Sequence, residues 1–424
     1  LSEEIKSLKP TGSRICVVTD SRVGTLYQNA VCQELERTGL HVDVFVFPEG
    51  EASKNLNTVQ DLYRFLIEHR YTRKDLLAAL GGGVVGDLTG FAAATYLRGV
   101  DFIQIPTTLL AQVDSSVGGK TGVDFDQYKN MVGAFHQPRL VYMNMEVLKT
   151  LDADQFASGM GEVLKTALIR DGAFYEWIIN HMEPIMDRTG AVLAKMIQKC
   201  CQIKSSVVES DPTEKGERAI LNLGHTVGHA IEKLKDFQLL HGHCVALGTV
   251  AAAYISFRRG YLSTEEFYEI RDMNVGFDLP IFFDGLTAEE ILRATKSDKK
   301  MEGNHVKFIL LHGSVDQTPG CPASGRTGEY YSDSGRFPAA ISGEPGRCFR
   351  AAAEPDLAVC DPHRHFSGGG GMGLYPASEN QTVYAAAYYG GGSGFRGAGQ
   401  SDRPDPSGLC GGLLLFFADR FPHF

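Results

Sequence analysis

One segment decides the fold: Asp75-Leu76-Leu77-Ala78-Ala79-Leu80-Gly81-Gly82-Gly83-Val84-Val85-Gly86-Asp87. Its first half is an apolar run of strand length, and its second half contains G-x-G-x-x-G as Gly81, Gly83 and Gly86. A glycine turn lets a pyrophosphate approach the backbone, and the N-terminus of the following helix supplies amide donors and a positive dipole. The segment therefore predicts a strand–turn–helix unit that binds a dinucleotide, although a plain tight turn would also suit these glycines.

Strand and helix signals alternate on both sides of this segment. β-rich runs cover residues 14–19, 42–47, 75–80 and 102–105, with helical periods between them over 26–38, 56–70 and 86–97. This order predicts an α/β fold for residues 1–150, a Rossmann-like parallel sheet with helices on both faces. One departure is that the glycine motif follows the third strand, whereas the usual fingerprint follows the first.

The rest of the chain divides into a helical part and an unusual tail. Residues 151–312 carry helical runs over 156–169, 173–182, 192–210, 224–234, 245–259 and 288–294, which predict a second, mainly α-helical domain. Residues 313–424 hold 21 of the 48 glycines, and the last lysine is Lys307. We interpret this tail as disordered or as translated in a shifted frame, and we assign it no function.

Composition excludes some classes of function. The 424 residues carry a net charge of -10, which argues against a general nucleic-acid surface. The longest apolar run, residues 244–257, is too short to span a bilayer, and no signal peptide is visible. Nine cysteines without a C-x-x-C pair suit reduced thiols. We therefore expect a cytoplasmic protein with no membrane or nucleic-acid partner.

Histidines gather in the second domain. His225 and His229 stand four apart, and His241 and His243 follow 12 and 14 residues after His229. Positions i and i+4 share a helix face, and imidazole is the commonest protein ligand for a transition metal. The spacing suggests that His225 and His229 chelate an ion with a third histidine, although satisfied core histidines fit the pattern about as well.

Charged residues beside glycines suit anion binding. Asp114-Ser115-Ser116-Val117-Gly118-Gly119-Lys120-Thr121-Gly122 contains a Gly-Gly-Lys-Thr loop but lacks the full Walker spacing, so it does not predict ATP binding. Glu162 and Lys165 share a helix face, where they could form a surface ion pair. Because the surrounding residues are apolar, Glu162 could instead be part of a metal site. Glu214, Arg218 and Asn222 follow a spacing of four that a solvated helix face also explains.

In combination, these segments resemble the 3-dehydroquinate synthase family of sugar phosphate cyclases, in order from residue 14 to about 312. The resemblance rests on residues 81–87, 98–99, 106–122, 129–130, 161–165, 221–232 and 298–300. The resemblance implies a NAD- and metal-dependent lyase that converts 3-deoxy-D-arabino-heptulosonate 7-phosphate to 3-dehydroquinate and phosphate in the shikimate pathway. It also implies that NAD is regenerated in each turnover and that the enzyme is a homodimer.

The resemblance implies a role for each matching residue. Glu162, His225 and His241 match the ligands of one divalent ion, zinc or cobalt, and His229 matches a histidine that moves a substrate proton. Several residues match groups that bind the phosphate and the carboxylate of the substrate: Lys120, Lys165, Lys204, Arg218, Asn130, Asn222 and one of Lys299 and Lys300. Arg98 matches a phosphate contact that relatives supply across the dimer, and Glu214 matches a residue near the ring hydroxyls. Asp114 and Lys129 match residues between the substrate and the nicotinamide.

The resemblance also implies the residues that hold NAD. Their matches are Asp20, Glu49, Gly50, Glu51, Lys54, Gly83, Val84, Val85, Gly86, Asp87, Thr107, Thr108, Lys120, Lys129, Val147, Leu148, Lys149 and Thr150. Arg22 stands where relatives often carry asparagine. His243 stands where relatives usually carry a glutamate, which we expect to support the metal ligands, so its loss is expected to weaken the metal site.

Three alternatives remain open from the sequence. Another sugar phosphate cyclase, making an inosose or a valiolone, would share the fold, NAD and metal. A metal-dependent polyol dehydrogenase of related fold would release NADH. An inactive product of a damaged gene would explain the tail.

Overall fold

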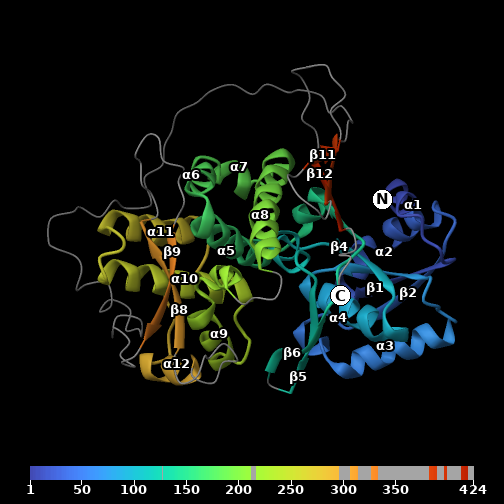
Figure 1. The fold of residues 1–424 in the computed structure, drawn as a ribbon, viewed down its shortest axis with the longest axis horizontal. Coiled ribbons are helices and arrows are strands. Elements are labelled where there is room, and N and C mark those ends of the chain that lie inside the picture. The colour runs from blue at the N-terminus through green and yellow to red at the C-terminus, as the bar shows by residue number, and fades with distance from the viewer. Residues whose placement is uncertain are drawn as a thin grey trace, which may run out of the picture.

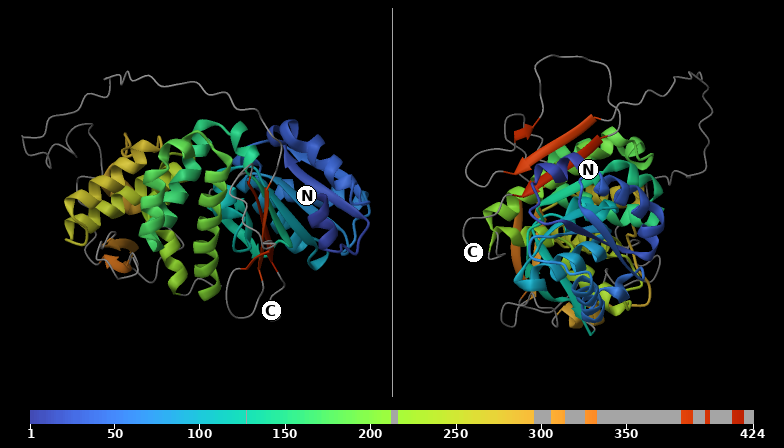
Figure 2. Two further views of the ribbon diagram at one scale, coloured as in Figure 1. Left: turned by 90° about the horizontal axis from the view of Figure 1, so that it is seen from above. Right: turned by 90° about the vertical axis from the view of Figure 1, so that its right-hand side faces the viewer.

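The computed structural model describes residues 1–126, 128–211, 216–295, 306–313, 326–332, 382–388, 396–398 and 412–418. These form two bodies, a sheet domain and a helical domain, side by side along the long axis of the molecule (Figures 1 and 2). The predicted fold class is confirmed. The predicted division at residue 150 and the interpretation of the tail stay predictions.

A parallel sheet forms the centre of the first body. Its strands follow the order β7-β4-β3-β1-β2, and they are β1 (Arg14–Asp20), β2 (His41–Phe47), β3 (Leu76–Gly81), β4 (Asp101–Pro106) and β7 (Leu140–Asn144). The four strands predicted from the sequence are present, and β7 is the one that the prediction missed. Because β1 pairs with both β2 and β3, the chain reverses its direction of travel across the sheet beside β1.

Helices cover both faces of this sheet. Cys16 and Val18 of β1 pack with α3 (Leu56–Glu68) and α4 (Gly83–Thr95), whereas Ile15 and Val17 pack with α1 (Ser2–Ser7) and α2 (Ser21–Glu36). Side chains along a strand point alternately to the two faces, so a continuous apolar run is what a strand covered on both sides requires.

Shorter elements connect the strands of the first body. They are η1 (Glu51–Ser53), η2 (Tyr96–Arg98), the π-helical turn η3 (Ala111–Ser115), η4 (Met145–Thr150) and the hairpin of β5 (Lys120–Phe125) and β6 (Tyr128–Phe135). The hairpin packs against α4 and extends beside the helical body (Figure 1). It therefore brings side chains of the sheet domain to the boundary with the helices.

The second body is helical, as predicted. Its elements are α5 (Ala153–Arg170), α6 (Gly172–Asn180), α7 (Met182–Met186), α8 (Gly190–Ser210), η5 (Glu217–Asn222), α9 (His225–Leu234), α10 (His241–Arg258), α11 (Thr264–Gly276), α12 (Ala288–Thr295) and the strand β8 (Val306–His312). Leu164, Ile197 and Ala246 contribute to its shared apolar core. Among the described helices, none combines the length and the apolar character that a bilayer crossing needs.

Four described strands lie in the tail: β9 (Arg326–Ser332), β10 (Thr382–Tyr388), β11 (Arg396–Ala398) and β12 (Gly412–Ala418). The backbone of β9 pairs with β8, and β12 pairs antiparallel with β7, so that β12, β10 and β11 extend the sheet at that edge. The sequence analysis assigned no strands to this region.

Glycines allow the helices of the second body to cross in backbone contact. A Cβ atom at Gly242, in the first turn of α10, would lie 1.7 Å from the carbonyl oxygen of Ser158 in α5. A Cβ atom at Gly248 would lie 1.8 Å from the carbonyl oxygen of Gly224, which immediately precedes α9. Helix axes can approach this closely only where no side chain stands between them. The crossing of α5, α9 and α10 is therefore set by glycines.

We expect Gly242→Ala to lower the free energy of unfolding by about 3 kcal/mol or more, because the added methyl group meets backbone that has no space to yield. Gly24→Ala in α2 is the matched control. Its nearest neighbour would be the Thr19 methyl group at 3.3 Å, so its effect should stay within about 1 kcal/mol. Chemical denaturation measures both, and equal stability of the two variants would contradict this account of the crossing.

Candidate active site

Three ionisable side chains meet where α5, α9 and α10 cross. Glu162 lies in the middle of α5, His225 is the first residue of α9, and His241 is the first residue of α10. The Nε2 atoms of both imidazoles lie 3.4 Å from Oε1 of Glu162. The structure thus groups His241, rather than His229, with His225 and Glu162, which differs from the pairing that the histidine spacing alone suggested.

The three side chains fit a divalent metal ion. Glu162 is fully buried, and neither of its oxygens accepts a hydrogen bond from the described part of the chain, although Lys165 Nζ lies 2.5 Å from Oε2. Such a buried carboxylate is costly unless a cation compensates it. One carboxylate oxygen and two imidazole nitrogens within 4.8 Å of one another form a donor set of the catalytic type, with room for substrate. Their role as metal ligands stays a prediction.

Electrostatics at this group favours bound cations. Burial opposes the charge of Glu162, but Lys165 and His241 outweigh it and hold the pKa of this carboxyl well below its usual range. Burial likewise opposes the charge of His241, yet the carboxylates of Glu162 and Glu232 on either side of the ring raise its pKa to about 10. His241 therefore lies between two carboxylates, in a position that stabilises positive charge.

The other two histidine rings have distinct surroundings. His225 Nδ1 lies 3.1 Å from the carbonyl oxygen of Leu223, which suits an imidazole with its proton on Nδ1 and the lone pair of Nε2 directed at Glu162. The ring of His229, one helical turn later, is half-buried, with its centroid 5.2 Å from that of His225 and 5.8 Å from that of His241. It is therefore placed to act beside the metal position.

Glu232 belongs to this site and was missed by the sequence analysis. It is buried on α9, and its Oε2 lies 3.5 Å from Nδ1 of His241. Lys129 Nζ, from the hairpin, lies 2.8 Å from Oε1 of Glu232. Burial opposes ionisation, but His241 and Lys129 lower the pKa of Glu232 to about 2. A signal was present, since Glu232 follows His229 by three residues and shares its helix face.

His243 and Glu232 have different surroundings. Glu232 lies beside the predicted ligand His241, whereas His243 is half-buried near the backbone of Asp154, and burial lowers its pKa. Its Nε2 has no hydrogen-bond partner among the described residues. Two residues along a helix turn a side chain by more than half a revolution, so His241 and His243 face different neighbours. The expected weakening of the metal site by His243 stays a prediction, although His243 is not the residue that contacts Nδ1 of His241.

Buried cations lie next to the metal position. Lys204 Nζ of α8 lies 2.7 Å from Oδ1 of Asp114, and the charges of Asp114 and Lys165 influence each other. Arg218 is buried, and its guanidinium lies beside Gly118 of the predicted anion loop. The structure thus brings Lys165, Lys204, Asp114 and Arg218 to the boundary between the two bodies, where an anionic substrate would meet the metal position.

The other predicted substrate residues are less closely gathered. Lys120 is exposed at the start of β5, and the Asn130 side chain on β6 accepts a hydrogen bond of 2.7 Å from Lys54. Arg98 is exposed beyond the end of α4, roughly 20 Å from the glycine turn at the start of that helix. Asn222 ends η5, three residues before His225. Glu214, Lys299 and Lys300 lie outside the described residues.

The predicted NAD residues follow the carboxyl ends of all five parallel strands. Asp20 ends β1 and caps α2, Glu49 follows β2, Gly83 follows β3, Thr107 follows β4, and Val147 follows β7. Ligands of open parallel sheets bind beyond the carboxyl ends, at the point where the strand order reverses. β3 adjoins that point beside β1, so the late position of the glycine motif agrees with dinucleotide binding.

The glycine turn leaves space that side chains would fill. A Cβ atom at Gly82 would lie 3.0 Å from the Thr108 methyl group, and one at Gly83 would lie 3.2 Å from Oγ of Ser115. The α4 cap makes no side-chain hydrogen bond, so its first amides suit a pyrophosphate. Lys54 Nζ lies 2.7 Å from Asp87 at the same turn. These features fit NAD, and each residue's role in binding it stays a prediction.

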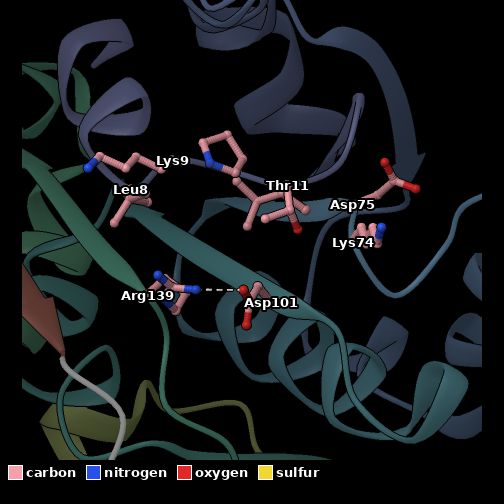
Figure 3. A pocket seen from close by; sticks show the side chains of 9 residues that line it. Leu8, Lys9, Thr11, Lys74, Asp75, Asp101 and Arg139 are labelled. Carbon is pink, nitrogen blue, oxygen red and sulfur yellow. Dashed lines mark hydrogen bonds and ion pairs between the residues drawn. The ribbon is translucent and has the colours of Figure 1, made fainter.

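A separate cavity of about 310 Å³ lies at the other end of the strands, away from the predicted active site. Figure 3 shows Leu8, Lys9, Thr11, Lys74, Asp75, Asp101 and Arg139 around it, with Arg139 paired to Asp101 at 2.7 Å. Asp101 begins β4, and Asp75 immediately precedes β3, so the cavity faces the amino ends of the strands. It therefore has no part in the site at the carboxyl ends.

Comparisons with known proteins agree with this geometry. The model of the 3-dehydroquinate synthase N-terminal family matches residues 44–158, and that of the C-terminal family matches residues 159–301. A 3-dehydroquinate synthase of Acetivibrio thermocellus is 43% identical over 317 residues, which cover 75% of this chain and 88% of the relative. One of Nitrosospira multiformis is 48% identical over 299 residues, which cover 70% and 82%.

Solved structures of sugar phosphate cyclases have a similar fold. A 2-deoxy-scyllo-inosose synthase in complex with carbaglucose-6-phosphate, NAD+ and Co2+ is 26% identical with a TM-score of 0.65, covering 78% of this chain and 89% of that one. A 2-epi-5-epi-valiolone synthase of Streptomyces hygroscopicus with NAD+ and Zn2+ is 24% identical with a TM-score of 0.69, covering 76% and 88%. At 24% identity, the likeness to the valiolone synthase shows a shared fold and nothing more.

We expect Glu162→Gln to abolish tight metal binding, because the amide cannot supply the negative charge that compensates the ion. The wild-type chain should retain one zinc or cobalt ion after dialysis, and the variant should bind at least about 100-fold more weakly. Metal analysis and competition with a fluorescent chelator measure both. Glu176→Gln, on α6 away from the cluster, is the control and should bind as the wild type does. Retention of one ion by Glu162→Gln would remove this residue from the ligand set.

Proposed function

The chain belongs to the 3-dehydroquinate synthase family, and we propose that it converts 3-deoxy-D-arabino-heptulosonate 7-phosphate to 3-dehydroquinate and phosphate. This reaction belongs to the shikimate pathway and makes the enzyme a carbon–oxygen lyase with NAD and a divalent metal as cofactors. The main observation in its favour is that residues 44–158 and 159–301 match the N- and C-terminal models of the family in order, while the fold brings Glu162, His225 and His241 to one point.

Glu162, His225 and His241 would hold the metal. A bound zinc or cobalt ion supplies Lewis acidity toward the substrate's oxygens, and bound NAD accepts a hydride and returns it. Around these groups the chain orients the sugar and excludes water. Glu162 and Lys165 are almost fully buried, so charges on the substrate interact with them through a medium of low dielectric constant.

The cationic groups would bind the substrate's two anionic ends. Lys165, Lys204 and Arg218 are each buried and come from three different elements, α5, α8 and η5. Fixed guanidinium and ammonium groups suit a phosphate and a carboxylate at a set separation. Lys120, Asn130 and Asn222 would complete this contact with hydrogen bonds, as would Glu214 and Lys300. Asp114, which pairs with Lys204, would hold that ammonium in place.

NAD would lie along the carboxyl ends of the sheet. The pyrophosphate would meet the amides that open α4, and the ribose would meet Glu51 and Lys54 of the loop after β2. Lys129 would lie between the nicotinamide end and the substrate. The homodimer, with Arg98 of the second chain at the substrate phosphate, and the cytoplasmic location are parts of the same proposal.

The full chain should release phosphate from the heptulosonate phosphate, and a chelator should stop the release until zinc or cobalt is restored. NADH should not accumulate, because the hydride returns to the substrate in each turnover. Phosphate detection, absorbance of the nicotinamide and product identification by mass spectrometry measure these outcomes, with Glu162→Gln as the negative control.

The same assay separates the other functions. Turnover of sedoheptulose 7-phosphate or glucose 6-phosphate in place of the heptulosonate would identify another cyclase. Accumulation of NADH with a polyol would identify a dehydrogenase. Phosphate release that is insensitive to the chelator would contradict the metal-dependent proposal, and a chain without any turnover would contradict activity in this protein.

We expect His229→Asn to lower kcat by about 10²–10⁴-fold while metal content stays at one ion per chain, because the ring moves a proton and does not bind the metal. Steady-state kinetics and metal analysis on the same preparation measure the two effects. Loss of the ion in His229→Asn would instead make this histidine a ligand.

A further inference from the structure

Glu232 links a predicted metal ligand to the sheet domain. Its carboxylate is buried, with one oxygen 3.5 Å from Nδ1 of His241 and the other 2.8 Å from Nζ of Lys129. Nε2 on the opposite side of the His241 ring faces Glu162. A carboxylate at the outer nitrogen of a metal-binding imidazole fixes the orientation of the ring and increases its basicity.

Lys129 continues this link across the boundary between the two bodies. It comes from β6, 103 residues before Glu232 in the chain. Its Nζ also lies 3.5 Å from Oε1 of Glu51, in the loop after β2. The charges then continue in alternating sign, with Lys54 3.9 Å from Glu51 and 2.7 Å from Asp87 at the glycine turn. Six charged or ionisable groups thus join the metal position to the predicted NAD site.

His229, Glu232 and His241 also satisfy the geometry of a second metal site. The ammonium of Lys129 already compensates Glu232 at 2.8 Å, and a second divalent ion here would share His241 with the first. Two cations of this charge and an ammonium, each within a few ångströms of the others, repel strongly in a buried setting. The geometry therefore favours a supporting role for Glu232 over a second ion.

We propose that Glu232 is a positioning residue for the metal ligand His241, and that Lys129 and Glu51 make metal binding and NAD binding depend on each other. This inference rests on the proposed metal and NAD sites. NAD at the loop after β2 would hold Glu51 against Lys129, which in turn holds Glu232 against the imidazole. By linkage, the metal must then increase NAD affinity by the same factor by which NAD increases metal affinity.

The positioning role is tested by metal affinity without substrate. Competition of zinc between the protein and a fluorescent chelator should give a dissociation constant about 10–100-fold higher for Glu232→Gln than for the wild type. Glu232→Asp, which keeps the charge, should recover part of the loss. The matched control is Glu289→Gln, an exposed residue of α12, which packs against α9. A dissociation constant of Glu232→Gln within twofold of the wild type would overturn the role, as would two zinc ions per wild-type chain.

The coupling is tested by titrating zinc with and without saturating NAD. The wild type should bind zinc at least about 5-fold more tightly with NAD, the lower end of typical coupling, and Lys129→Met should reduce this factor to near one. Lys129 is partly exposed, so this variant decides the coupling even where Glu232→Gln fails to fold. A factor near one in the wild type, or an unchanged factor in Lys129→Met, would overturn the coupling.

These outcomes are distinct from failure of the proposed function. Zinc and NAD binding that follow these expectations in a chain without phosphate release would count against the reaction alone. Chelator-sensitive phosphate release, combined with unchanged zinc affinity in Glu232→Gln, would count against this inference alone.

Discussion

The backbone contact among α5, α9 and α10 is the constraint on which the metal position depends. Gly242 approaches Ser158, and Gly248 approaches Gly224, at distances that leave no space for a Cβ atom. Each of these two contacts adjoins a predicted ligand, because His241 precedes Gly242 and His225 follows Gly224. Two helices that begin with a histidine can therefore place both rings on one oxygen of Glu162. The same glycines that pack the helical core set the separation of the ligands.

The sheet domain imposes a second constraint. Its predicted NAD-binding residues lie beyond the carboxyl ends of its strands. Loops after β1, β2, β3, β4 and β7 all open toward one edge, and η4 then leads directly into α5. The predicted dinucleotide and metal positions consequently face each other across the boundary of the two bodies. The hairpin of β5 and β6 spans this boundary, which explains how Lys129 contacts groups of both.

Much of this arrangement was predictable from the sequence. Continuous apolar runs predicted four strands of the sheet, because a strand covered on both faces has no polar side, and the shorter β7 was missed. Motif resemblance identified Glu162, His225 and His241, which lie up to 79 residues apart and which no spacing rule would join. Glu232 was missed although it shares a helix face with His229, because its contacts with His241 and with Lys129, 103 residues away, depend on the fold. The effect of His243 stays a prediction; its side chain, two residues after His241, lies on another side of the helix.

At the boundary between the two bodies, buried carboxylates and cationic side chains lie in pairs of opposite charge. An isolated buried carboxylate is very costly, and each carboxylate here has a cationic neighbour: Lys165 for Glu162, Lys204 for Asp114 and Lys129 for Glu232. A divalent ion at Glu162 adds positive charge next to Lys165, so the anionic substrate is the remaining partner that balances the site. In the proposed arrangement, metal, substrate and NAD would each bind more favourably when the others are present, since each would compensate charge that its neighbours leave unbalanced or fix a side chain that its neighbours require.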